Sequence, residues 1–126
     1  MDNKKIIDAV FLAIEKYGLM ETIGELFGAG AQIKMDFNVS ALKTPICDLG
    51  LSVRSYNALS RAGLDTVEKV IDAMQENKIA SIRSLGAKSK AEIHVKIYEF
   101  GYASMSERAK KEFANTLVAL NLTEKE

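Results

Sequence analysis

The chain has 126 residues, 48% of them hydrophobic and 27% charged, and its 17 basic side chains balance its 17 acidic ones. A protein of this size can bury a core of its own, and its composition argues against disorder, while its single Cys47 excludes an internal disulfide. A net charge of zero excludes a protein that binds polyanions through bulk charge. Any nucleic-acid binding must therefore depend on where individual cations lie.

The sequence gives no sign of a membrane protein. No stretch approaches the roughly 20 consecutive apolar residues that a membrane-spanning helix needs. Lys4 and Lys5 precede an apolar run, as in a signal peptide, but Asp8 interrupts that run. We expect a cytoplasmic protein without membrane association.

The N-terminal part combines helices with one alternating stretch. Residues 3–18 have the apolar spacing of an amphipathic helix, which Gly18 ends, and a short helix follows through Leu26. Apolar and polar residues then alternate strictly over residues 32–39, which predicts a strand. Because a lone strand leaves its backbone groups unpaired, three alternatives follow. The segment pairs with a second copy to form a homodimer, packs in extended form on the helices, or is no strand.

After Pro45 the sequence changes to short helices joined by tight turns. One helix is capped by Ser52 and stopped by Gly63, and a second has Asp65 as its expected cap. A short helix lies near residues 78–82.

The C-terminal part predicts two longer helices. The first runs to about Phe100 and ends at Gly101. The last helix spans residues 107–120, after a capping box formed by Ser104 and Glu107.

The stretch SLGAKSKAEI, residues 84–93, contains a second S-x-x-E capping box, formed by Ser89 and Glu92. In the simpler interpretation Gly86 supplies a turn, Ser89 caps the helix and Lys88 is solvated. In the other, the helix start binds an anion, because its free N–H groups and positive dipole end favour negative charge.

A similar turn lies 36 residues earlier. Residues 49–55 place Leu-Gly before a small residue at a helix start, with Arg54 in the first turn. Two such turns indicate a duplicated unit whose helix starts face one nucleic-acid backbone.

Residues 42–103 resemble the C-terminal domain of the bacterial RNA polymerase alpha subunit. The resemblance is carried by LKTPICDLGLSVRSYNALSRAGLDTV and IASIRSLGAKSKAEI, in matching order and spacing. It implies a compact four-helix domain related to helix-hairpin-helix proteins. It also implies binding to the A·T-rich minor groove and to transcription activators. The chain looks like a free-standing relative of that domain.

The resemblance also implies roles for individual residues. Arg54 matches the arginine that enters the minor groove, where narrow A-tracts concentrate negative potential, and Asn57 is its polar neighbour on the same helix face. Gly86, Lys88 and Ser89 match the hairpin that contacts phosphates.

Some positions near that surface differ from the family or point to a protein partner. Glu92 matches a position that can cap a helix or meet a partner, and Arg61 is a second candidate partner contact. Ser60 and Ala87 stand where relatives often carry a cation. Fewer cations predict weaker binding and a shallower salt dependence.

We therefore predict a mostly α-helical protein: a compact bundle of short helices with helix-hairpin-helix-like turns, one candidate strand and an extra C-terminal helix. Residues 1–41 form an N-terminal segment that can dimerise, 42–103 the polymerase-like domain and 104–126 the last helix.

No catalytic or metal site can be assembled around the single histidine, His94, and Cys47, so we expect neither an enzyme nor a cofactor. Two functions remain. One is a DNA-binding transcription regulator. The other is an interaction module that binds RNA polymerase or a transcription factor, with DNA binding weakened or lost.

Overall fold

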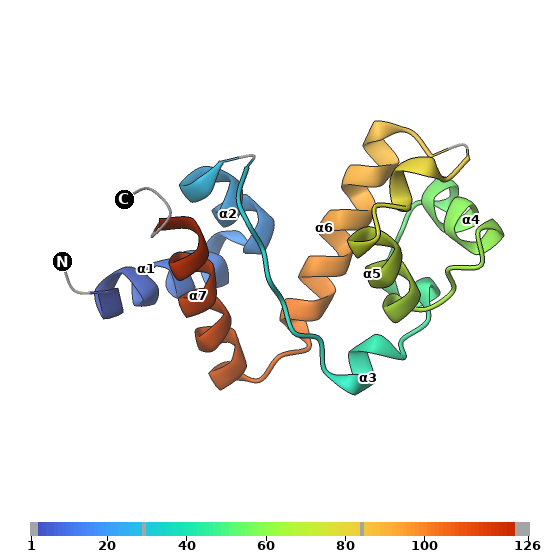
Figure 1. Ribbon diagram of the computed structural model, residues 1–126. Coiled ribbons are helices and arrows are strands. Elements are labelled where there is room, and N and C mark those ends of the chain that lie inside the picture. Colours follow the sequence, from blue (N-terminus) through green and yellow to red (C-terminus); the bar gives the residue numbers. More distant parts are fainter. Residues whose placement is uncertain (1–2, 29, 84, 123–126) are drawn as a thin grey trace. The chain divides into compact units, whose positions relative to one another are not determined.

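The computed structural model describes residues 3–28, 30–83 and 85–122. These ranges hold seven α-helices and two 3-10 helices and no sheet, which confirms the mostly α-helical prediction. The elements, drawn in Figure 1, are α1 (Asn3–Tyr17), α2 (Leu19–Phe27), α3 (Val39–Leu42), η1 (Ile46–Leu49), α4 (Val53–Arg61), α5 (Val67–Gln75), η2 (Ile79–Ser81), α6 (Ala87–Ala103) and α7 (Glu107–Leu122).

The chain divides into two compact units. Residues 1–36 and 102–126 form one unit, which we call the terminal unit because it includes the first and last helices. Residues 37–101 form the other, the central unit.

The terminal unit is built from α1, α2 and α7, which lie together in Figure 1. Gly18, with a left-handed φ of 97°, allows the turn between α1 and α2, as the sequence predicts. Tyr102 packs edge-on against Phe113 with 5.9 Å between ring centroids, and its hydroxyl donates to Glu15 at 2.9 Å. The buried side chains of this unit are mainly Val10, Phe11, Ile14, Leu19, Ile23, Tyr102, Phe113, Ala114, Leu117 and Val118.

The predicted strand at residues 32–39 is an extended segment without a strand partner among the described residues. Its apolar side chains are half-buried and its polar ones exposed as far as Phe37, whereas Val39 begins α3 and is 65% exposed. The Asn121 side chain accepts the Gln32 N–H at 2.8 Å and donates to the Gln32 carbonyl at 2.9 Å. At Gln32 a side-chain amide thus takes the place of a neighbouring strand, and within one copy the segment is extended, as in the second of the three alternatives.

The core of the central unit is apolar and continuous. Leu59, Val67, Val70, Ile93 and Ile97 are fully buried, which ties α4, α5 and α6 together. Truncating one such side chain typically costs about 2–5 kcal/mol of folding free energy. The remaining buried members of this core are Ile46, Leu49, Ala58, Ala73, Ile79 and Leu85.

Two predicted helix caps lie one or two residues away from the true ones. Thr66 caps α5 by accepting the Lys69 N–H at 3.3 Å, whereas Asp65 pairs with the Lys69 ammonium at 3.0 Å. Ser106 caps α7 by accepting the Ala109 N–H at 3.1 Å, a role that the sequence suggested for Ser104. In both helices the capping side chain accepts the backbone N–H three residues later, which has no partner within the first turn of the helix.

The predicted end of α6 at Gly101 is also wrong. The helix continues through a buried Gly101 to Ala103. This extension places Tyr102 in the core of the terminal unit, where its burial outweighs the low helix propensity of one glycine.

Candidate nucleic-acid interface

The first turn of α4 presents Arg54 to solvent. Gly50, with a left-handed φ of 72°, turns the backbone from η1 into this helix. Ser52 is the N-cap, as predicted, and its hydroxyl oxygen accepts the Ser55 N–H at 3.3 Å. Ser55 is buried, whereas Arg54 and Asn57, three residues apart, are exposed on one face. The two side chains assigned to the minor groove therefore point away from the core.

The start of α6 lies earlier than the sequence indicates. The helix begins at Ala87, and the Gly86 carbonyl accepts the Lys90 N–H at 3.0 Å, so Gly86 occupies the N-cap position. The predicted cap, Ser89, lies inside the first turn and is only 9% exposed, while Lys88 is exposed. A ligand at this end would therefore meet the Lys88 ammonium and main-chain N–H groups rather than the Ser89 hydroxyl.

Nothing within the described residues requires glycine at position 86. Its φ lies outside the left-handed region, and a Cβ atom placed there would meet no atom within 4 Å. The turn interpretation of Gly86 therefore lacks a steric reason. The open space in front of it allows an external group to approach the N–H groups of the first turn of α6.

The Glu92 carboxylate, on the second turn of α6, caps α4 instead of its own helix. It accepts the Ser52 N–H at 2.9 Å, the Ser52 hydroxyl at 2.8 Å and the Ser55 hydroxyl. The predicted capping box between Ser89 and Glu92 is therefore wrong, because the Glu92 side chain bonds to residues 40 and 37 positions away. These bonds fix the first turn of α4 against α6.

The same contacts stabilise the charged form of Glu92. The bond from the Ser55 hydroxyl lowers the pKa of Glu92 most, and the groups of Ser52 and the charge of Lys96 lower it further. Partial burial acts in the opposite direction but does not prevail. Because the pKa is lower in the folded protein, this stabilisation is present above the ordinary pKa and is lost as the pH falls through the folded value.

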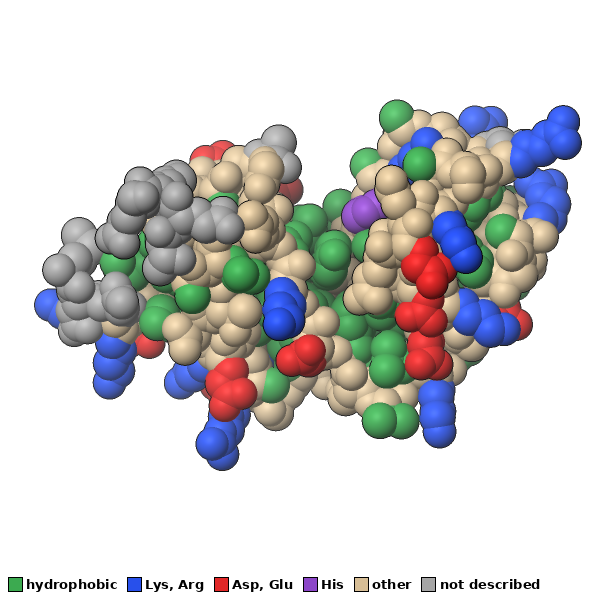
Figure 2. Space-filling view, viewed as in Figure 1, with side chains coloured by type: hydrophobic (Ala, Val, Ile, Leu, Met, Phe, Trp, Pro, Cys, Tyr) green, Lys and Arg blue, Asp and Glu red, His purple; other side chains and the backbone are tan. Residues whose placement is uncertain are grey.

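The two units differ in charge, although the whole protein is neutral. Residues 37–101 contain nine Lys and Arg against seven Asp and Glu, a net charge of +2, and the terminal unit carries the opposite net charge of −2. Figure 2 shows Lys and Arg side chains gathered over the end of the central unit that carries α4 and the start of α6. Part of the positive charge of the central unit therefore lies on the end that holds α4 and the start of α6.

A groove in the central unit, which sequence reasoning missed, has a volume of about 770 Å³. Arg61, the candidate partner contact, lines it together with Lys78 and Arg83, over a floor that includes Leu64 and Ile82. Lys78 is also paired with Glu76 at 2.9 Å. The sequence signal for this groove is Arg83, a cation that lies just before the Leu-Gly turn at residues 85–86.

The single histidine and the single cysteine each contact one nearby backbone or side-chain oxygen. His94 is exposed and its Nδ1 lies 2.9 Å from the Lys90 carbonyl, while the exposed Cys47 lies 3.7 Å from the Asp48 carboxylate. Within the described ranges, no three His, Cys, Asp or Glu side chains are grouped as metal ligands. In the same ranges no helix is long and apolar enough to cross a membrane.

The part of the chain that matches a known protein family is nearly the same as the central unit. The family described as bacterial RNA polymerase, C-terminal domain of the alpha chain, matches residues 35–99, about half of the sequence. The protein therefore belongs to this family of non-catalytic domains, which confirms the resemblance.

Individual relatives are DNA-directed RNA polymerase alpha subunits. The subunit of Rubrobacter xylanophilus is 38% identical over 109 residues, which cover 84% of this chain and 32% of that subunit. The subunit of Tropheryma whipplei is 35% identical over 96 residues, covering 66% of this chain and 29% of that subunit. The chain thus spans about a third of the length of these relatives. No solved structure matches it.

The Glu92 contact predicts a pH-dependent stability. Glu92→Gln keeps an acceptor oxygen but removes the charge, so we expect the free energy of unfolding at neutral pH to fall by about 1–2 kcal/mol. The difference in free energy of unfolding between wild type and Glu92→Gln should become smaller as the pH falls below 4.5, the ordinary pKa of a glutamate side chain. Urea unfolding measures both effects. Glu99→Gln, at an exposed position of the same helix, is the control. An equal loss at acidic and neutral pH would contradict the role given to the charge.

Proposed function

We propose that residues 37–101 bind duplex DNA and that the protein acts as a transcription regulator. The observation that carries this proposal is the set of three hydrogen bonds that Glu92 accepts from Ser52 and Ser55. They hold the start of α4 against α6 with Arg54 and Lys88 exposed. Family membership supports the proposal, because the alpha C-terminal domain binds DNA and transcription factors.

In this proposal the two helix starts have different tasks. Arg54 enters the minor groove of A·T-rich DNA, where the negative potential is strongest, with Asn57 beside it. Lys88 and the free N–H groups at the start of α6 hold the phosphate backbone, which comes close at Gly86. Since Glu92 already neutralises part of the positive end of α4, the phosphate contacts belong mainly to α6.

A second function, a protein-interaction module, is favoured by the groove that Arg61, Lys78 and Arg83 line. Three cations around an apolar floor suit a segment that carries acidic side chains on either side of an apolar one. Such a segment would belong to RNA polymerase or to a transcription regulator. The two functions are compatible, because they use different residues of the central unit.

Arg54→Ala tests the minor-groove contact. We expect wild type to prefer an A·T-rich duplex over a G·C-rich one, to bind more weakly at higher salt, and to lose about 1–3 kcal/mol of binding free energy on substitution. Fluorescence anisotropy of labelled duplexes at two salt concentrations measures this. Arg108→Ala, which removes an exposed arginine of α7, is the matched control and should leave binding unchanged. Wild type that binds neither duplex at low salt would exclude the DNA function and leave the interaction module.

Gly86→Ser tests the phosphate contact at the start of α6. Serine fits sterically and is a favourable N-cap, so the stability should stay equal or rise by a few tenths of a kcal/mol. DNA affinity should nevertheless fall, by about fivefold or ~1 kcal/mol, because the new side chain blocks the approach and occupies an N–H group. The same anisotropy titration, with thermal unfolding alongside, separates the two effects. Unchanged affinity would mean that no phosphate lies against this turn.

A further inference from the structure

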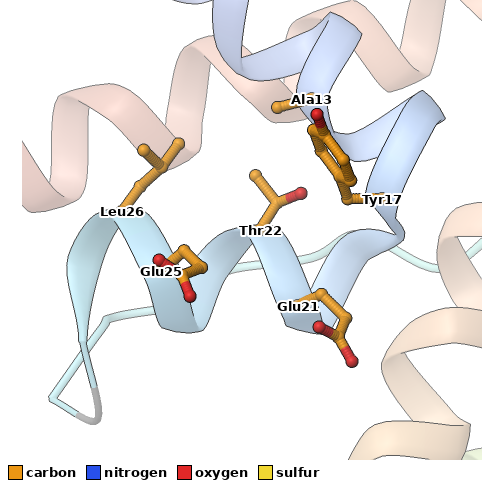
Figure 3. Close-up of a pocket in the computed structure, with 6 residues that line it drawn as sticks. All are labelled: Ala13, Tyr17, Glu21, Thr22, Glu25 and Leu26. Atoms are coloured by element: carbon orange, nitrogen blue, oxygen red, sulfur yellow. The ribbon is translucent and has the colours of Figure 1, made fainter.

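The terminal unit has a groove between α1 and α2 that the DNA function does not use. Its volume is about 430 Å³. Figure 3 shows Tyr17 and Leu26 on either side of Thr22, with two acidic side chains along the α2 edge. Thr22 is 3% exposed, and its hydroxyl has no hydrogen-bond partner among the residues that the structure describes. We call this the α1–α2 groove, and it is lined by Ala13, Tyr17, Glu21, Thr22, Glu25 and Leu26.

Large apolar side chains around the groove face solvent. Tyr17 is 62% exposed and Leu26 is 50% exposed. Leu12 is 64% exposed on α1 and does not line the groove, because it lies about 100° around the helix from the groove residue Ala13. Exposed apolar side chains of this size favour contact with another macromolecule, because burying them contributes about 25 cal/mol per Å².

The charges around the groove are separated by helix. Glu21 and Glu25 lie one turn apart on α2, and like charges at that spacing destabilise a helix by about 0.2–0.5 kcal/mol. No ion pair found among the described residues involves either of them. On α1, Lys16 lies beside the groove, 5.2 Å from the Tyr17 ring centroid and one turn after Leu12. The exposed face of α1 therefore carries an apolar side chain beside a cation, and the groove offers an apolar slot beside two anions.

We infer that the α1–α2 groove takes Leu12 of a second copy of this chain, with Lys16 of each copy against Glu21 and Glu25 of the other. The surface is self-complementary, which is what a two-fold dimer requires. If the two α1 helices pack antiparallel, each copy's Leu12 reaches the other copy's groove, and both sets of charges are paired at once. The dimer would join two DNA-binding central units, an arrangement that does not depend on the predicted strand at residues 32–39.

The mass of the 126-residue chain in solution tests the inference. Sedimentation equilibrium at micromolar to submillimolar concentrations should approach twice the 13.9 kDa of one copy, and the dimer should weaken as salt is raised. Leu12→Asp should weaken the dimer by at least about tenfold. Val39→Asp is the matched control, because Val39 is equally exposed but lies in the central unit at the start of α3, where an acidic residue suits a helix. Circular dichroism of each variant checks that it is folded.

A charge exchange makes the test specific. Glu21→Lys with Glu25→Lys, in one variant, and Lys16→Glu, in another, should each weaken self-association by at least about tenfold, because like charges then meet. A mixture of the two variants should restore a dimer near wild-type strength, since each substituted group faces an opposite charge on the other copy. A monomer at every concentration would overturn the inference. A dimer that survives Leu12→Asp, or a mixture of the two charge variants that fails to associate, would also overturn it. If only Val39→Asp abolished the dimer, the contact would instead lie at residues 32–39.

Discussion

The central unit depends on one carboxylate that joins two helices. Glu92 places a negative charge at the positive end of α4, and three hydrogen bonds from Ser52 and Ser55 compensate the water that it loses. Hydrogen bonds to a carboxylate depend on direction as well as distance, so these three bonds fix the first turn of α4 against α6. The orientation of Arg54 and Asn57 follows from that start, because residues one turn apart on a helix share a face.

Charge is divided between the units in a way that suits separate tasks. The central unit carries the positive excess and the two exposed helix starts, whereas the terminal unit carries the negative excess and the exposed apolar side chains of the α1–α2 groove. A negative terminal unit would gain little from DNA contact, which leaves its surface available for a protein. In the proposed dimer, two DNA-binding units would bind DNA more tightly than one unit alone.

Local patterns predicted the elements well and their long-range partners poorly. Helical periodicity, Gly18 and the Ser52 cap depend on neighbours in sequence, so the sequence suffices for them. The S-x-x-E spacing of Ser89 and Glu92 looked local as well, but the carboxylate accepts from donors on α4 that no local pattern reveals.

The extended segment and the groove show the same limit. The alternation in residues 32–39 correctly marked which side chains are half-buried as far as Phe37, yet it could not show that Asn121 would bond to the backbone of Gln32. The two Leu-Gly turns made the helix starts candidates, and the family resemblance assigned roles to their residues. The structure added Arg83 and the groove beside this site.

Whether both helix starts of residues 37–101 form one DNA-binding face can be tested residue by residue. Amide chemical shifts of the ¹⁵N-labelled 126-residue chain, followed by NMR during titration with an A·T-rich duplex, report which backbone groups meet DNA. We expect the largest changes to cluster at the first turns of α4 and α6, around Arg54 and Lys88, and to leave α1, α2 and α7 nearly unchanged. Changes confined to the terminal unit, or changes at only one of the two helix starts, would contradict this face.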